Sequence, residues 1–386
     1  MRSNYEKICP YIRKAEIRNS KGSTENLLGV SVSKAFMPSI ANTVGTDFTS
    51  YRVVKRNQFT YIPDTSRRGD KIGIALLDSL DEGIVSQAYT VFEISDKEKL
   101  DPQYLMMWFR RPEFDRYARY ISHGSVREIF EWEDMCNVSL PIPSITKQRE
   151  IVAEYNTIQD RIKLNEQLIQ KLELIAKTIF ESCTKKSGGR TIHRLGDFIE
   201  IKGGFSYNSE QLGTGETYLL GMGCVSFKER FVEEGMRLYS DDVPVQHMVK
   251  QNDIIIATRQ QSDNLPILGC PAMIPPNFNG RKLVIASNLY RVVNKSCLSN
   301  EIIYQVLKSK NYQEHIKLHT KGTTVGMITK DAVENYVFEA PPIESLFGVQ
   351  KHFDALANYL FIKRSEKRNL IELKHALLSK LATIEN

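Results

Sequence analysis

The sequence lacks the marks of secreted, disulfide-stabilised and membrane-spanning proteins. Its six cysteines are scattered over 386 residues without a C-x-x-C pair. There is no secretory leader, and no apolar run approaches the roughly 20 residues that a membrane-spanning helix needs. These absences predict a reduced, cytoplasmic protein with neither a disulfide framework nor a membrane span.

Catalytic and cofactor signatures are also missing. The glycine-rich P-loop of phosphate-binding proteins does not occur. Gly213 and Gly215 begin a dinucleotide-like G-x-G-x-x-G pattern, but Tyr218 occupies the place of its third glycine and no clean strand precedes it. His315 and His319 have the spacing of a helical metal pair without an evident third ligand, which favours a solvated helix face. We therefore expect no catalytic, cofactor-binding or metal site, although a triad that assembles only in space would leave no such pattern.

The composition is that of an ordinary globular protein, with 41% hydrophobic and 25% charged residues. A chain of this length supports two or three domains, each large enough to bury a core. The 52 basic residues exceed the 46 acidic ones, which gives a formal net charge of +6. This excess favours a nucleic-acid partner only slightly, because many enzymes carry a similar charge.

The chain contains an internal repeat. Asn57 aligns with Asn252, Ser86-Gln87 with Ser287-Asn288, and Gly124 with Gly322, at offsets between 195 and 201 residues. Insertions in loops explain the small variation in offset. The period is far longer than that of a solenoid, so the pattern predicts a duplicated domain.

A proline-marked boundary and a long helical pattern follow each copy. Leu140-Pro141-Ile142-Pro143 closes the first copy and Ala340-Pro341-Pro342-Ile343 closes the second. Proline disfavours helix in the preceding residue and suits the first helical turn. Beyond each boundary, apolar residues recur at alternating steps of three and four, which predicts a coiled-coil seam. The candidate seam residues are Ile151, Tyr155, Ile158, Ile162 and Asn165 in the first helix, and Val349, Phe353, Leu356 and Leu360 in the second.

The middle of the second helix is polar. Residues 363–369 read KRSEKRN and interrupt its apolar stripe. We therefore expect the two helices to pair well at their ends, and poorly or through water in between. Asn165 lies in the seam of the first helix, where a polar residue commonly fixes register; a solvated kink is the alternative.

Equivalent loops of the two copies carry cations, amides and hydroxyls. Arginine can bind guanine through two hydrogen bonds and glutamine can bind adenine, while lysine and hydroxyl groups suit phosphates. Ordinary surface turns and strand caps would use the same residue types, so these alternatives remain open. The candidate DNA-contacting residues are Arg67, Arg68, Lys71, Ser86, Gln87, His123, Ser125 and Arg127 in the first copy, and Arg259, Gln260, Gln261, Ser287, Asn288, Lys321, Thr323 and Thr324 in the second.

This order of elements resembles the DNA-specificity subunit of type I restriction-modification systems. Residues 140–153, LPIPSITKQREIVA, are similar to that family's entry to its first conserved helix, and residues 370–378, LIELKHALL, to the leucine-rich end of the second. Residues 251–257 and 201–205 are similar to landmarks of its target-recognition domains. The second boundary departs from the pattern, because it carries Leu346-Phe347-Gly348 and lacks the glutamine of the first.

The resemblance implies an α+β fold in which two globular target-recognition domains stand in a pseudo-two-fold arrangement, separated by two long antiparallel helices that form a coiled coil. The expected boundaries are 1–142 for the first recognition domain, 143–187 for the first conserved spacer helix, 188–341 for the second recognition domain and 342–386 for the second spacer helix.

The resemblance also implies a function in phage defence. Each recognition domain would read one half of an asymmetric, bipartite site in double-stranded DNA, and the helices would set the spacer and dock the methyltransferase subunits. The chain would be non-catalytic and bind no cofactor. Two modification subunits would use S-adenosylmethionine, and two restriction subunits would use ATP and Mg²⁺. The alternatives are a stand-alone DNA-modifying enzyme and a coiled-coil scaffold that does not bind DNA specifically.

Overall fold

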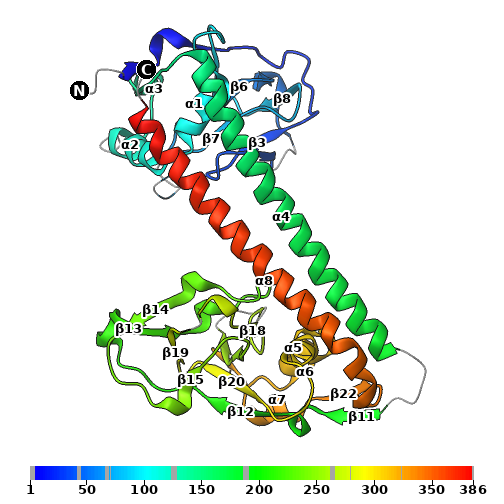
Figure 1. Ribbon diagram of the computed structural model, residues 1–386. Helices are drawn as coiled ribbons and strands as arrows, with labels where there is room; N and C mark the ends of the chain where they lie inside the picture. The colour runs from blue at the N-terminus through cyan, green and yellow to red at the C-terminus, as the bar shows by residue number, and fades with distance from the viewer. Residues whose placement is uncertain are drawn as a thin grey trace. The chain divides into compact units, whose positions relative to one another are not determined.

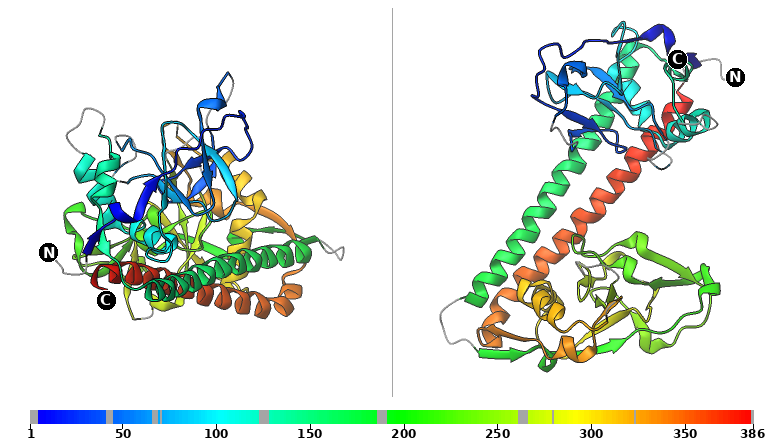
Figure 2. Two further views of the ribbon diagram at one scale, coloured as in Figure 1. Left: turned by 90° about the horizontal axis from the view of Figure 1, so that it is seen from above. Right: turned by 180° about the vertical axis from the view of Figure 1, so that it is seen from behind.

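The computed structural model describes residues 5–40, 45–65, 69, 71–122, 128–185, 191–260, 266–278, 280–322 and 324–384. The chain divides into two compact units. Unit 1 comprises Met1–Leu164 with Lys367–Asn386, and unit 2 comprises Asn165–Glu366. Two long helices, α4 (Ile145–Lys185) and α8 (Ile343–Lys380), each contribute residues to both units and are unbroken in every view (Figures 1 and 2). Within the described ranges, no helix is long and apolar enough to cross a membrane.

In its described residues, unit 1 combines short strands with three short helices and parts of the long ones. Its shorter helices are α1 (Pro102–Phe109), α2 (Pro112–Ser122) and α3 (Trp132–Cys136). Its strands are β1 (Tyr5–Lys7), β2 (Ile12–Lys14), β3 (Leu28–Val30), β4 (Phe36–Pro38), β5 (Arg52–Lys55), β6 (Gln58–Tyr61), β7 (Ile74–Leu76), β8 (Glu82–Val85), β9 (Thr90–Ile94) and β10 (Ser139–Pro141).

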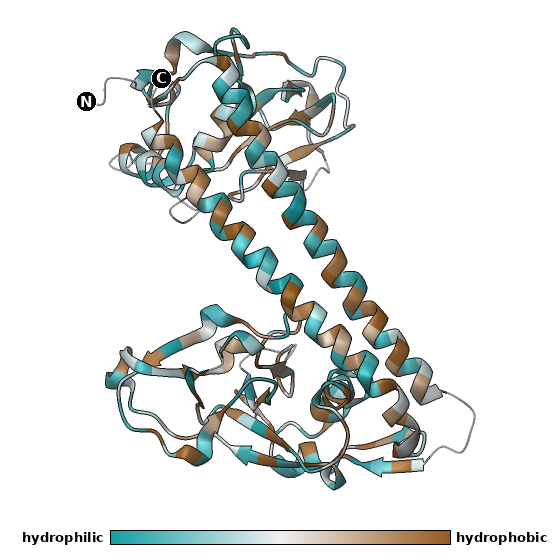
Figure 3. Ribbon diagram, in the orientation of Figure 1, coloured by the Kyte–Doolittle hydropathy of each residue, from teal (hydrophilic) through white to brown (hydrophobic). Residues whose placement is uncertain are grey.

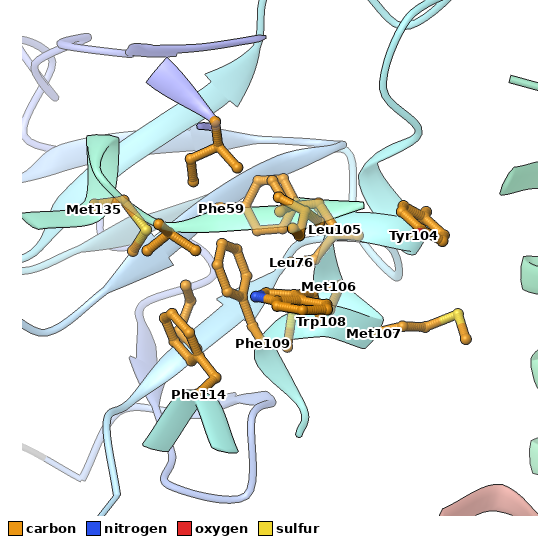
Figure 4. Packing of buried hydrophobic residues seen from close by; sticks show 14 of the residues in the cluster. Phe59, Leu76, Tyr104, Leu105, Met106, Met107, Trp108, Phe109, Phe114 and Met135 are labelled. Carbon is orange, nitrogen blue, oxygen red and sulfur yellow. The ribbon is translucent and has the colours of Figure 1, made fainter. Parts of the chain in front are cut away.

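The centre of unit 1 is an antiparallel sheet with the strand order β2-β9-β6-β7. Aromatic residues from its strands and from α1 pack together with leucine, isoleucine and methionine side chains in the core (Figure 4). The rings of Phe59 and Phe92 stack with centroids 4.8 Å apart, and Phe109 of α1 meets Phe59 edge-on at 5.8 Å. Such offset and edge-on pairs add about 0.5–1.5 kcal/mol each to the gain from burial, so they hold α1 firmly on the sheet.

Unit 2 is also built from short strands, short helices and parts of the long helices. Its shorter helices are α5 (Asn300–Lys308), α6 (Lys310–Leu318) and α7 (Lys330–Glu334). Its strands are β11 (Thr191–Arg194), β12 (Ile199–Gly203), β13 (Leu212–Leu220), β14 (Met236–Tyr239), β15 (Met248–Val249), β16 (Ile254–Ala257), β17 (Arg259–Gln260), β18 (Pro271–Met273), β19 (Lys282–Ile285), β20 (Leu289–Asn294), β21 (Gly326–Met327) and β22 (Val337–Ala340).

The main sheet of unit 2 repeats the topology of unit 1. Its order is β12-β20-β16-β18, again antiparallel throughout, and β16 occupies the place of β6. The turn before each central strand carries an asparagine with positive φ, at +66° for Asn57 and +65° for Asn252. Asparagine tolerates this left-handed region better than most residues. The two sheets therefore have the duplication that the sequence repeat predicts, down to one backbone conformation.

Unit 2 has a second sheet, with the order β14-β13-β19-β15 and a parallel pair between β13 and β19. The dinucleotide-like Gly213 and Gly215 lie at the exposed beginning of β13, where the pairing with β14 shifts register. A phosphate-binding G-x-G-x-x-G turn instead connects a strand to a helix N-terminus. The structure thus places this motif in a bulged strand.

The long helices bury apolar residues in both units. In unit 1, Ile151 and Tyr155 of α4 share a cluster with Leu378 of α8, whereas in unit 2 Ala176 of α4 shares a cluster with Phe353 of α8. Along both helices, apolar and polar residues alternate (Figure 3). Of the candidate seam residues, Val349 and Leu356 are half-buried. The others are buried: Ile151, Tyr155, Ile158, Ile162, Asn165, Phe353 and Leu360.

The polar centre of α8 does not interrupt the helix. Arg364 is mostly buried, and its guanidinium is ion-paired with Glu173 of α4 and with Glu229. Lys363 pairs with Glu366 at 2.8 Å. This part of α8 is therefore joined to its neighbours through ion pairs, where the sequence predicted a poorly paired or wet segment.

Gln148 anchors the start of α4. Its side chain is fully buried, donates to the carbonyls of Lys99 (2.9 Å) and Pro143 (2.8 Å), and accepts from the backbone N–H of Asp101 (2.9 Å). Asp101 in turn caps the N-terminus of α1. One glutamine thus joins the first turn of α4 to the beginning of α1.

Replacing Gln148 with leucine would leave this buried N–H and these two carbonyls without their partner. We expect the Gln148→Leu change to lower the free energy of unfolding by about 3 kcal/mol, because each unsatisfied buried group is costly. Urea denaturation would measure the change. Gln170→Leu, at an exposed position of the same helix, is the matched control and should have an effect within about 0.5 kcal/mol. Equal losses in the two variants would refute the anchoring role.

Candidate nucleic-acid interface

In unit 2, several of the candidate DNA-contacting residues come together around one pocket of about 190 Å³. Arg259 of β17, Ser287 and Lys321 come from three separate segments of the chain, and all three line it. The arrangement offers two cations, hydroxyl groups and one aromatic ring at a single place. The lining residues are Thr258, Arg259, Ser287, Tyr290, Lys321, Met327, Ile328 and Thr329.

Backbone hydrogen bonds hold the walls of this pocket together. Strands β17 and β21 pair Arg259 with Met327 in antiparallel register. Met327 also exchanges two backbone hydrogen bonds of 2.8 Å with Lys321, and the N–H of Ile328 donates to the carbonyl of Thr258 (3.1 Å). Because main-chain bonds fix both segments, the two exposed cations stay at the same edge of the unit.

Tyr290 also stabilises the wall of the pocket that contains Ile328. Its phenol donates to the carbonyl of Ile328 at 3.0 Å. Burial raises the pKa of this phenol, and the positive charge of Arg259 only partly offsets the increase. Tyr290 therefore stays neutral at ordinary pH and acts as a fixed hydrogen-bond donor.

Gln260 is used by its own loop. Its side-chain carbonyl accepts from the backbone N–H groups of Ile267 (2.6 Å) and Leu268 (3.0 Å). A glutamine that reads adenine needs its carbonyl and amide groups together. With the carbonyl occupied, the amide NH₂ of Gln260 is the group that is left to face a ligand.

The turn at Ser287-Asn288 depends on a glycine across from it. Both residues are half-buried, and the carbonyl of Asn288 accepts from the N–H of Thr258 (3.1 Å). A Cβ on Gly204 would lie 2.1 Å from the carbonyl oxygen of Ala286, which leaves no room for a side chain. The backbone at Gly204 thus lies directly against the base of this turn.

Unit 1 has the same backbone pairing with different side chains. An isolated antiparallel bridge joins Asp64 to Ile129, in the place that Arg259 and Met327 occupy in unit 2. The N–H of Thr65 donates to the carbonyl of Glu128 (3.0 Å). The two units therefore share the construction of this edge but carry opposite charges at the corresponding position.

The remaining candidates in unit 1 lie on its surface. Lys71 and Gln87 are exposed and Ser86 is half-buried. The Ser86 hydroxyl accepts from the N–H of Ala88 (3.3 Å), which is the strand-capping role that the sequence left open. In unit 2, Thr324 is exposed near Lys321 in the chain. The candidates that lie outside the described residues are Arg67, Arg68, His123, Ser125, Arg127, Gln261 and Thr323.

His315 and His319 use their ring nitrogens internally. The rings stack at 4.0 Å, His315 Nε2 bonds the carbonyl of Ala332 (2.8 Å), and His319 Nδ1 bonds the carbonyl of His315 (2.8 Å). Burial lowers the pKa of His315. Across the part of the chain that the structure describes, no group of three or more metal-ligating side chains occurs.

Sequence reasoning missed a buried ion network in unit 2 around Arg230. Its guanidinium is fully buried and bonds both Glu301 of α5 and Glu173 of α4. The three residues are far apart in the chain, and each is of a charged type that usually lies on the protein surface. The only signal was the polar centre of α8, which contributes Arg364 to the same network.

The fold is that of a known class of protein. The chain shares its fold with the crystal structure of a type I restriction-modification S subunit from M. genitalium, with a TM-score of 0.62 at 13% identity over 99% of this chain and 96% of the other. The HsdS subunit from Thermoanaerobacter tengcongensis aligns over 98% of this chain and 96% of its own, at 18% identity and a TM-score of 0.38.

A sequence relative carries a name of the same class. The "putative type I restriction enzyme MjaX specificity subunit" of Methanocaldococcus jannaschii is 22% identical over 314 residues, which are 75% of this chain and 69% of the relative. No family model matches the chain. The resemblance to type I specificity subunits, predicted from the sequence, is thus confirmed by a relative and by a solved structure of that kind.

The close approach at Gly204 leads to a prediction about the candidate interface. Gly204→Ala should lower the free energy of unfolding by about 2 kcal/mol, because the added methyl group overlaps a backbone carbonyl that must move. The neighbouring Gly203→Ala is the matched control, since its nearest contact would be the flexible Lys330 side chain at 3.8 Å. Thermal denaturation of both variants would test this. A stable Gly204→Ala protein would refute the tight packing of this turn.

Proposed function

We propose that the chain is the sequence-specific DNA recognition subunit of a type I restriction-modification complex. The observation that carries the proposal is the repeated sheet with an equivalent, backbone-paired edge in each unit, where Asp64 of unit 1 corresponds to Arg259 of unit 2. One construction with two sets of side chains suits the recognition of two different half-sites. The recognised sequence would accordingly be asymmetric and bipartite.

In unit 2, the pocket edge supplies the chemistry for such recognition. Arg259 is exposed and can bind a guanine through two hydrogen bonds, while Lys321 suits a phosphate oxygen. The fixed backbone around them supports accurate placement, since recognition groups work best on rigid elements. We propose residues 188–341 as the second recognition domain and residues 1–142 as the first.

The long helices would form an antiparallel coiled coil between the recognition domains. In support, the first turns of α4 pack with the last turns of α8 in unit 1. In unit 2, the last turns of α4 pack with the first turns of α8. Residues 143–187 and 342–386 would then be the two spacer helices, related by a pseudo-two-fold axis. In this arrangement the helices set the length of the unread spacer.

The complex would supply the chemistry that this chain lacks. We propose that the chain binds no cofactor and docks two modification subunits, which use S-adenosylmethionine, and two restriction subunits, which use ATP and Mg²⁺, in the cytoplasm. A stand-alone DNA-modifying enzyme would instead methylate or cut DNA as the purified chain. A coiled-coil scaffold would not favour one DNA sequence over competitor DNA.

Modified-base sequencing of the source genome, with and without this gene, tests the proposal. We expect deletion to abolish methylation at one split, asymmetric motif, because the modification subunits would lose their only means of recognising it. The modification subunits must be shown to be expressed in both strains. An unchanged methylation pattern under that condition would contradict the proposed function.

The pocket edge leads to a second prediction, for the complex with its modification subunits. Arg259→Ala should weaken binding by about 5- to 150-fold and relax base preference in one half-site only, because a lost bidentate contact removes about 1–3 kcal/mol of discrimination. Lys321→Ala should weaken binding to all sequences alike and reduce the salt dependence by about one counterion. Fluorescence anisotropy with half-site variants at several salt concentrations would measure both effects.

The control for these substitutions is Lys310→Ala. Lys310 is highly exposed on α6, where it pairs with Glu314, and it does not line the pocket. Its removal lowers the charge by the same amount and should leave base preference intact. If Arg259→Ala altered both half-sites, independent reading by the two units would be refuted.

A further inference from the structure

Unit 2 contains a buried charged network that includes none of the candidate DNA-contacting residues. The Arg230 side chain is 0% exposed. Its two terminal nitrogens bond the carboxylate of Glu301 at 2.6 and 2.7 Å, and its Nε bonds Glu173 at 2.8 Å. Tyr304 stacks against the same guanidinium at 4.7 Å. Every edge of this buried cation therefore has a defined partner.

Glu173 connects this cation to both long helices. It lies on α4, and its Oε1 accepts from Arg230 and, at 3.2 Å, from Arg364 on α8. Arg364 also pairs with Glu229, the residue next to Arg230 in the chain. Two arginines and three carboxylates thus join the recognition module of unit 2 to α4 and α8 at one point.

The charges of Glu173 and Arg230 are held in their ionised forms. Burial alone would raise the pKa of Glu173, but Arg230 and Arg364 outweigh burial, and the pKa lies below the ordinary carboxyl value. The pKa of Arg230 is raised despite burial, because Glu301 and Glu173 surround it. Charge-assisted bonds between planar groups are directional, so the network specifies an orientation as well as an attachment.

Unit 1 places other groups at the corresponding positions. Gln103 follows the helix cap of α1 as Glu301 follows that of α5, and its side chain bonds Asp78 at 3.4 Å. In unit 1, Gln148 anchors the first turn of α4 to the beginning of α1. At the equivalent position of α8 in unit 2, Leu346 packs in the same apolar cluster as Leu298. The two recognition modules are therefore fastened to the helices by different chemistry.

We propose that Glu173 and Arg364 are positioning residues, which set the orientation of the second recognition module on its helix pair and thereby the spacer length that the complex accepts. This inference rests on the proposed function. Because apolar packing is less directional than charge-assisted hydrogen bonding, the ion network would favour one angle of the module on its helices. Loosening it should widen the range of accepted spacers without altering the bases that are read.

Arg364→Met tests the inference in the complex with its modification subunits. The change severs the link from α8 but leaves Arg230 paired with both of its carboxylates. On DNA with the native spacer or a spacer one base pair longer or shorter, discrimination between spacers should fall about tenfold, the effect of one lost charge-assisted hydrogen bond. Base preference in each half-site should remain that of the native complex, and methylation rates on the DNA series would measure both quantities.

Two further variants make the result decisive. Arg364→Lys keeps the charge without the planar fork and should restore part of the spacer discrimination, while Lys351→Met at an exposed position of α8 should change nothing. Glu229→Gln, at a half-exposed carboxylate, should give a weaker effect in the same direction and serves if Arg364→Met does not fold. Native spacer discrimination in Arg364→Met, or in Glu229→Gln where the former does not fold, would overturn the inference. A native complex that recognises no bipartite site would overturn the proposed function itself.

Discussion

Each unit depends on one central strand that is buried along its whole length. All four residues of β6 and of β16 are buried, so their backbone groups must find partners on both sides. The neighbouring strands meet this requirement, β7 and β9 in unit 1 and β18 and β20 in unit 2. The loop that leaves the central strand is thereby brought against the segment before α3 or α7. In unit 2 this contact builds the edge where Arg259 and Lys321 lie.

The long helices take part in two kinds of interaction, which are apolar packing and buried ion pairs, and these differ in what they contribute. Fully burying a leucine such as Leu360 contributes about 1.5–3 kcal/mol, whereas exposed ion pairs contribute at most about 1 kcal/mol. Within each unit, the buried apolar residues of α4 and α8 therefore account for most of the stability of their packing. Removing one partner from a buried pair such as Arg230–Glu301 costs about 3–5 kcal/mol, although replacing the whole network by apolar residues would cost little. Such a network is better explained by the geometry it imposes than by stability.

Local patterns in the sequence predict much of this architecture. The spacing of residues such as Ile151 and Phe353 indicates helices with a buried face, and the alignment of Asn57 with Asn252 indicates a duplicated domain. Partners far apart in the chain leave no such pattern, so the bonds of Arg230 were not predictable. The hydrogen bonds of the Gln260 side-chain carbonyl to Ile267 and Leu268 were equally unpredictable. A glutamine beside an arginine has the same sequence whether its carbonyl meets a base or a backbone N–H.

The differences between the two units carry more functional information than their likeness. A duplicated domain that only stabilised the chain would gain nothing from opposite charges at Asp64 and Arg259, since both positions lie on the same backbone pairing. Side chains at a rigid, equivalent edge are free to diverge when each edge meets a different ligand. The two units also differ in how the first turn of each long helix is held. Gln148 of α4 forms buried hydrogen bonds, whereas Leu346 of α8 packs in an apolar cluster. The two edges are thus built alike but differ in charge at this position, and the proposed reading of two different half-sites rests on that difference.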